Sequence, residues 1–74
     1  MRKTFDAELL ELSRELTSMA ATARDAIDLV TSSLSTADAA GAKATIEMTA
    51  TLDQMERDIE NRCLRLLLQQ QPVG

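Results

Sequence analysis

Apolar residues recur at alternating spacings of four and three along the first part of this 74-residue chain. This spacing keeps the side chains on one face of an α-helix and is typical of helices that pack lengthwise against another helix. The pattern predicts a first helix over residues 4–34. Its core stripe consists of Phe5, Leu9, Leu12, Leu16, Met19, Ala23, Ala26 and Val30.

A second periodic segment follows the sequence SSLSTAD, which is rich in residues that favour turns and helix caps. We expect a turn over residues 35–38, where Ser35, Thr36 or Asp38 would cap a second helix over residues 39–70. Pro72 would end that helix, because the residue before a proline avoids helical torsion angles. The second apolar stripe consists of Ala42, Ile46, Met48, Leu52, Met55, Ile59, Cys63 and Leu66.

The two segments predict an all-α fold in which residues 1–74 form one domain, a long antiparallel helical hairpin. Gly41 lowers the helix preference of the second segment by up to about 1 kcal/mol, and we expect the first helical turn to fray there. A hairpin of this size has a marginal core, and Phe5 is its only aromatic residue. We therefore expect two hairpins to pair as a homodimer, a four-helix bundle that covers the leucines near the C-terminus.

The composition argues against several functional classes. The chain contains no histidine, so the usual zinc, haem and acid–base catalytic sites are unavailable and we expect no enzyme. The net charge is −4 and the basic residues are dispersed, which indicates no nucleic-acid partner.

Two further features of the sequence indicate where the protein is found. Its longest strongly apolar run, Leu66 to Leu68, is far shorter than the ~20 residues of a membrane span, and the N-terminal segment does not resemble a signal peptide. We therefore expect a cytoplasmic protein.

The single cysteine, Cys63, lies on an apolar stripe, which predicts a buried thiol without a disulfide partner.

Three acidic residues, Asp53, Glu56 and Glu60, lie three and four positions apart beside the second apolar stripe. Like charges at these spacings each destabilise a helix by roughly a few tenths of a kcal/mol, so the arrangement requires an explanation. One explanation is a solvated boundary row, in which Asp53 pairs with Arg57 four residues later. The other is a site for a cation or a basic partner, which would need further ligands from a second helix.

The run DIENRCLRLLLQQQPVG, residues 58–74, resembles the end of the second helix in the PhoU family, whose members carry a similar R-C-L-x-L-L-x-x-Q-x-P-V stretch. The opening MRKTFDAELLELSRELTSMA is also similar to the start of that family. Members of the family contain two three-helix repeats. The resemblance therefore implies that this chain corresponds to the first two helices of the first repeat, with the third helix absent.

The resemblance also implies a function. PhoU-family proteins are non-enzymatic regulators of phosphate uptake and of phosphate-starvation signalling. We therefore expect protein–protein contacts with the ATPase of the phosphate ABC transporter and with a sensor histidine kinase. These partners would provide the only connection to a membrane.

Acidic E/D-x-x-x-D motifs are associated with metal binding in this family, so the resemblance makes Asp53, Glu56 and Glu60 candidate ligands of iron, zinc or another divalent metal, with no cofactor required. Asp53 matches the second acid of such a motif, and Thr49 stands in the place of the first. Two alternatives to the regulatory function stay open. One is a structural, self-associating helical hairpin without a ligand, and the other is a carboxylate metal-binding module.

Overall fold

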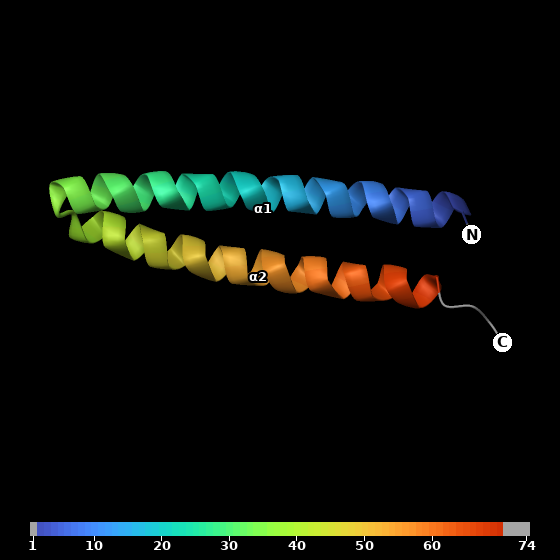
Figure 1. Ribbon diagram of the computed structural model, residues 1–74. Helices are drawn as coiled ribbons and strands as arrows, with labels where there is room; N and C mark the ends of the chain where they lie inside the picture. Colours follow the sequence, from blue (N-terminus) through green and yellow to red (C-terminus); the bar gives the residue numbers. More distant parts are fainter. Residues whose placement is uncertain (1, 71–74) are drawn as a thin grey trace.

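The computed structural model describes residues 2–70, which form two long helices running antiparallel along each other (Figure 1). Helix α1 spans Arg2–Thr36 and helix α2 spans Ala39–Gln69. The described residues contain no strand, and they extend over 59 × 17 × 12 Å. Neither helix in this part of the chain has an apolar stretch long enough to cross a membrane. The predicted all-α hairpin is confirmed.

The observed helix bounds differ slightly from the expected ones. Helix α1 extends two residues further at each end than expected, and α2 ends at Gln69 rather than at Gln70. The turn shortens because Ser35 and Thr36 stay helical, with their hydroxyls donating to the carbonyl oxygens four residues earlier. The helix stop expected at Pro72 lies outside the described residues.

Ala37 and Asp38 reverse the chain between the helices. Ala37 has a φ of 52°, the left-handed conformation that often follows the last residue of a helix. The N–H of Asp38 donates to the carbonyl of Ser33 at 3.1 Å, which closes the end of α1. The Asp38 carboxylate accepts a hydrogen bond from the N–H of Ala40 at 3.0 Å, so Asp38 is the residue that caps α2.

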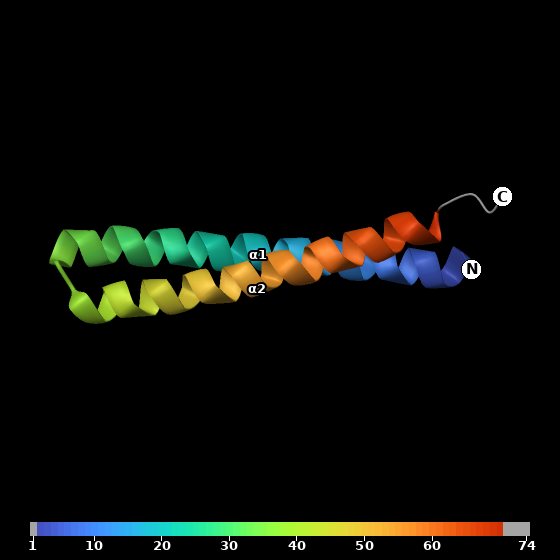
Figure 2. The same cartoon turned by 90° about the horizontal axis from the view of Figure 1, so that it is seen from below.

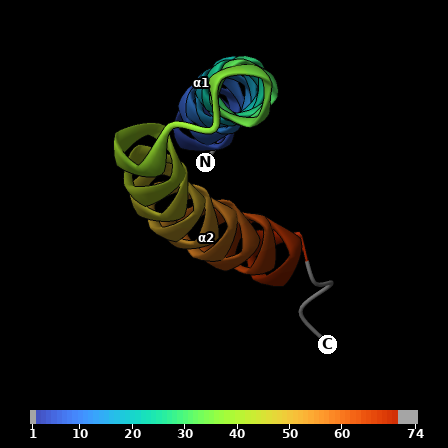
Figure 3. The ribbon, with the colours of Figure 1, turned by 90° about the vertical axis from the view of Figure 1, so that its left-hand side faces the viewer.

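The helices meet along a seam whose residues are mostly buried or half-buried and alternate at spacings of three and four. Figure 2 shows α2 running obliquely across α1, and the end-on view in Figure 3 shows that α2 is tilted relative to α1. The seam of α1 consists of Phe5, Glu8, Leu12, Glu15, Met19, Thr22, Ala26, Leu29 and Ser33. The seam of α2 consists of Gly41, Thr45, Met48, Leu52, Met55, Ile59, Arg62 and Leu66.

The seam of α1 differs from the predicted stripe at three of its alternate positions. Glu8, Glu15 and Leu29 are half-buried and face α2 instead of the residues that follow each of them, whereas Thr22 and the predicted Ala23 are both half-buried. Leu9, Leu16 and Val30 are 42%, 45% and 36% exposed as a result. The half-buried residues and the exposed residues that follow them both lie three or four positions from seam residues such as Leu12 and Met19. Helical periodicity therefore does not show which of the two rows faces α2. Packing against α2 selects between them.

Candidate functional site

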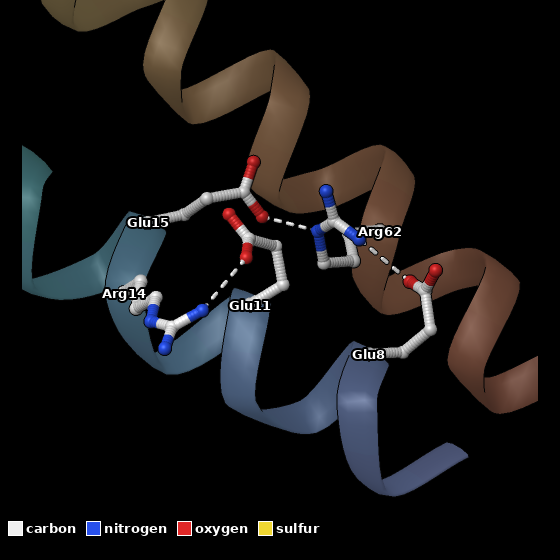
Figure 4. Close-up of polar contacts among 5 residues, drawn as sticks. All are labelled: Glu8, Glu11, Arg14, Glu15 and Arg62. Atoms are coloured by element: carbon white, nitrogen blue, oxygen red, sulfur yellow. Dashed lines mark hydrogen bonds and ion pairs between the residues drawn. The ribbon is translucent and has the colours of Figure 1, made fainter. Parts of the chain in front are cut away.

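A cluster of three charged residues lies in the seam, between the two helices (Figure 4). The Arg62 guanidinium of α2 donates to the Glu8 carboxylate of α1 at 2.6 Å and also to the Glu15 carboxylate. The Arg62 side chain is only 19% exposed, so solvent screens these ion pairs incompletely. The hydrogen bonds that Arg62 donates to Glu15 and, to a smaller extent, to Glu8 raise the pKa of Arg62 above its ordinary value.

This charged cluster serves the hairpin itself. Glu8 and Glu15 are seven residues apart on α1, and Arg62 bridges both. Sliding α2 along α1 by one turn would separate Arg62 from one of the two glutamates, so the cluster favours one register. Sequence reasoning missed this cluster, and its only signal in the sequence is that two glutamates lie seven residues apart beside the apolar stripe predicted for α1.

One side of the hairpin, which we call the leucine flank, exposes apolar side chains from Leu9 to Leu34. On each helix, the inner row of the flank consists of the residues that come directly after every second seam residue, such as Leu9 after Glu8 and Ala42 after Gly41. In an antiparallel helix pair, these two inner rows lie on the same side. On α1 the flank consists of Leu9, Ser13, Leu16, Ala20, Ala23, Ile27, Val30 and Leu34, of which only Ser13 is polar. On α2 it consists of Ala42, Ile46, Thr49, Asp53, Glu56, Glu60, Cys63 and Leu67.

The contacts at the turn end of the hairpin confirm that these rows share one side. A groove of about 580 Å³ there is lined by Val30 and Leu34 from α1 and by Ala42 and Ile46 from α2. Ile46 is 70% exposed and Leu34 is 78% exposed. Near the turn, the leucine flank is therefore an apolar surface that no other part of residues 2–70 covers.

The opposite side of the hairpin is polar. Helix α1 presents Thr4, Glu11, Ser18, Asp25 and Ser32 there, and α2 presents Thr51, Asp58 and Arg65 together with the apolar Ala44. A smaller hollow of about 170 Å³ on this side is lined by Ser18 and Asp58 together with seam residues. The two sides of the hairpin thus differ in chemistry, and the leucine flank is the one suited to contact with another helix.

Asp53, Glu56 and Glu60 lie on the leucine flank, where they form an exposed acidic row between apolar residues at both ends of α2. None of the three forms an ion pair within residues 2–70. Arg57 donates to the side-chain oxygen of Gln54 at 3.0 Å, and the pair of Asp53 with Arg57 does not form. The acidic row therefore carries uncompensated negative charge beside an apolar surface.

The acidic row does not provide a complete metal site. Among residues 2–70, no three carboxylate, histidine or cysteine side chains gather closely enough to hold a metal ion. Thr49, in the place of the first acid of the family motif, donates its hydroxyl to the Thr45 carbonyl at 3.0 Å. A metal ion bound by Asp53, Glu56 and Glu60 would need ligands from outside these residues, and metal binding stays a prediction.

Cys63 lies at the inner edge of the leucine flank, directly after Arg62. Its thiol is free and half-buried, so the hairpin alone buries it less fully than the sequence predicted. A further element packed on the leucine flank would cover it.

Comparison with known proteins connects this hairpin to one family. A family model described as the PhoU domain matches residues 16–74. The phosphate-specific transport system accessory protein PhoU homolog of Clostridium acetobutylicum is 35% identical over 72 residues, which are 97% of this chain and 33% of that protein. The chain thus spans about a third of the length of this relative. No solved structure matches the chain significantly.

Proposed function

The chain belongs to the PhoU family, and we propose on this premise that it is a non-enzymatic regulator of phosphate uptake and phosphate-starvation signalling. The observation that carries the proposal is the family match over residues 16–74. The name of the Clostridium relative describes it as an accessory protein of a phosphate-specific transport system. An accessory role is consistent with a chain that offers a contact surface and contains no histidine.

The proposed mode of action is protein–protein contact through the leucine flank. This flank exposes large apolar side chains, among them Ile27 at 65% and Leu67 at 66%. Exposed apolar surface of this kind is typical of interaction sites. The charged groups of the seam are paired with one another, so they contribute to the hairpin and are not available to a partner.

The proposed partners are the ATPase of the phosphate transporter and the sensor histidine kinase of the phosphate-starvation response. Both can be tested directly with the purified chain immobilised on a biosensor surface. We expect saturable binding of one of the two proteins, and we expect the Ile27→Glu/Ile46→Glu variant to lose it. The Leu10→Glu variant is the matched control, because Leu10 is also exposed but lies on the outer face of α1.

A cellular test addresses regulation. In a bacterium whose own PhoU-family gene has been deleted, expression of the chain should lower a phosphate-starvation reporter in phosphate-rich medium. The Ile27→Glu/Ile46→Glu variant should not lower it. An unchanged reporter, together with no binding to either protein by a folded chain, would contradict the proposed function.

The exposed leucine flank also favours a second candidate, a self-associating helical hairpin. Two hairpins that cover each other's flanks would form the four-helix bundle expected from the sequence. This arrangement needs no ligand and no phosphate-signalling partner. Self-association that survives at nanomolar concentration, without binding to the transporter ATPase or the kinase, would favour this candidate.

A further inference from the structure

The three methionines of residues 2–70 all lie in the seam, Met19 on α1 and Met48 and Met55 on α2. Thioethers and thiols are the side chains that peroxides oxidise, and the only cysteine, Cys63, lies outside the seam. Oxidation of a methionine would therefore change the contact between the two helices.

The register of the hairpin places Met19 and Met55 in one layer of the seam. Gly41 and Ser33 are in direct contact near the turn. Fourteen residues further along α2 lies Met55, and fourteen residues back along α1 lies Met19. The two steps cover the same length, because each helical residue rises by ~1.5 Å. Glu15, one turn before Met19, borders the same hollow as Met55, in agreement with this register.

Solvent reaches this layer from the polar side of the hairpin. The hollow of about 170 Å³ on that side is lined by Glu15, Ser18, Met55, Asp58 and Ile59. A hollow of this volume admits a molecule as small as hydrogen peroxide. It lies opposite the leucine flank, so an element that covers the flank would leave this access to Met55 open.

The surroundings of Met55 suit a thioether better than a sulfoxide. Oxidation replaces a flexible apolar side chain with one that carries a polar S=O group, which accepts hydrogen bonds. Glu15 and Asp58 offer carboxylates to the hollow, and an ionised carboxylate only accepts. Among the residues that line the hollow, only Ser18 has a side chain that could donate to the sulfoxide oxygen.

The small core of the hairpin makes it sensitive to such a change. Among the described residues, the buried apolar side chains are those of Ala26, Ile59 and Leu66. Met55 lies one turn before Ile59, so a polar group at Met55 would disturb the best-buried part of α2. One such group affects a large share of the contacts that hold so small a domain together.

We propose that the layer of Met19 and Met55 is a redox-sensitive element, in which a peroxide converts Met55 to its sulfoxide and weakens the contact between the helices. The sulfur attacks one peroxide oxygen, so that an S–O bond forms and the O–O bond breaks. The sulfur is oxidised by two electrons, and the displaced hydroxide takes the proton of the transferred OH group and leaves as water. A methionine sulfoxide reductase would reverse the change, with two thiols oxidised to a disulfide and the oxygen released as water.

The test treats the intact chain with hydrogen peroxide, in a Cys63→Ser background that removes the thiol as a second target. Peptide mapping by mass spectrometry locates the oxidised methionines, and circular dichroism gives the melting temperature before and after treatment. We expect Met55 to be oxidised faster than Met19 and Met48. The melting temperature should fall by about 5 °C or more, and methionine sulfoxide reductase with a dithiol should restore it.

Two volume-conserving variants locate the effect. Met55→Leu removes the sulfur with little change in packing, so its melting temperature should hardly change on peroxide treatment. Met48→Leu is the matched control, because Met48 also lies in the seam but does not border the hollow. This variant should lose as much thermal stability on oxidation as the Cys63→Ser background.

Three results would overturn the inference. The first is a chain with sulfoxide at Met55 that melts at the same temperature as the reduced chain. The second is equal protection by Met55→Leu and Met48→Leu, and the third is a Met55 that stays reduced while Met48 is oxidised. The inference goes beyond the proposed function, and none of these results bears on binding to the transporter ATPase or the kinase.

Discussion

Gly41 of α2 is buried directly against Ser33 of α1, next to the turn of the hairpin. A Cβ atom at position 41 would overlap the Ser33 hydroxyl and lie 3.0 Å from the Ser33 Cβ. The first turn of α2 is thus a close helix–helix contact and not a frayed end. We expect Gly41→Ala to destabilise the hairpin by about 1 kcal/mol, because overpacking outweighs the gain in helix preference.

Thermal unfolding followed by circular dichroism measures this effect. The Ser33→Gly/Gly41→Ala variant is the control, because it moves the glycine to the facing helix and should recover part of the loss. A Gly41→Ala variant that melts above the unmodified chain would show that the contact with Ser33 has room for a methyl group.

Replacing Arg62 with Ala should lower the melting temperature of the hairpin. The change leaves the Glu8 and Glu15 carboxylates partly buried in the seam without their cation, which lowers the free energy of unfolding. Arg65→Ala is the matched control, since Arg65 is exposed and forms no ion pair within the described residues. Equal melting temperatures for the two variants would mean that the Arg62 cluster does not stabilise the hairpin.

Leu12→Asp and Leu52→Asp should each unfold the chain. Both leucines lie in the seam, and an uncompensated charge there costs roughly 3 kcal/mol or more, comparable with the total stability of so small a domain. Leu10→Asp introduces the same charge on the outer face of α1 and should leave the helicity unchanged. Circular dichroism that shows native helicity in both seam variants would contradict the observed seam.

Without a partner, the hairpin should form a homodimer at tens of micromolar. Covering about four or five exposed Leu and Ile side chains at ~1.5–3 kcal/mol each outweighs the cost of association. Sedimentation equilibrium should give twice the 8.1 kDa of one chain. The Ile27→Glu/Ile46→Glu variant should be monomeric, and Leu10→Glu should stay dimeric. A folded monomer of the unmodified chain would remove the basis of this prediction.

Metal binding by the unmodified chain should be weak. The acidic row of Asp53, Glu56 and Glu60 is an incomplete ligand set, and the Thr49 hydroxyl is occupied by its hydrogen bond with Thr45. Calorimetric titration with Zn²⁺ or Fe²⁺ should therefore not saturate at micromolar metal. Thr49→Asp adds a carboxylate one turn before Asp53 and should tighten binding several-fold, with Asp53→Ala as the control. Tight, stoichiometric binding by the unmodified chain that is lost in Asp53→Ala would contradict this expectation.

The two helices, their antiparallel arrangement and the position of the acidic row beside the apolar stripe of α2 could all be predicted from the sequence. These features depend on residues close in sequence, through helical periodicity, capping and the short turn at Ala37 and Asp38. Periodicity also placed Leu12, Met19, Leu52 and Ile59 in the seam correctly. Asp38 was one of three possible caps, and its hydrogen bond with Ala40 decided between them.

Packing between the two helices selects which of two neighbouring rows of α1 faces α2. Leu16 and Glu15 both lie three or four residues from the seam residues Leu12 and Met19, and hydrophobicity alone favours Leu16 as the residue that faces α2. Glu15 is accommodated because the register of the two helices brings Arg62 within hydrogen-bonding distance of it. The same register buries Gly41 against Ser33 and leaves Leu16 exposed on the leucine flank. Contacts between residues far apart in sequence set this register, and a periodic pattern within one helix does not contain them.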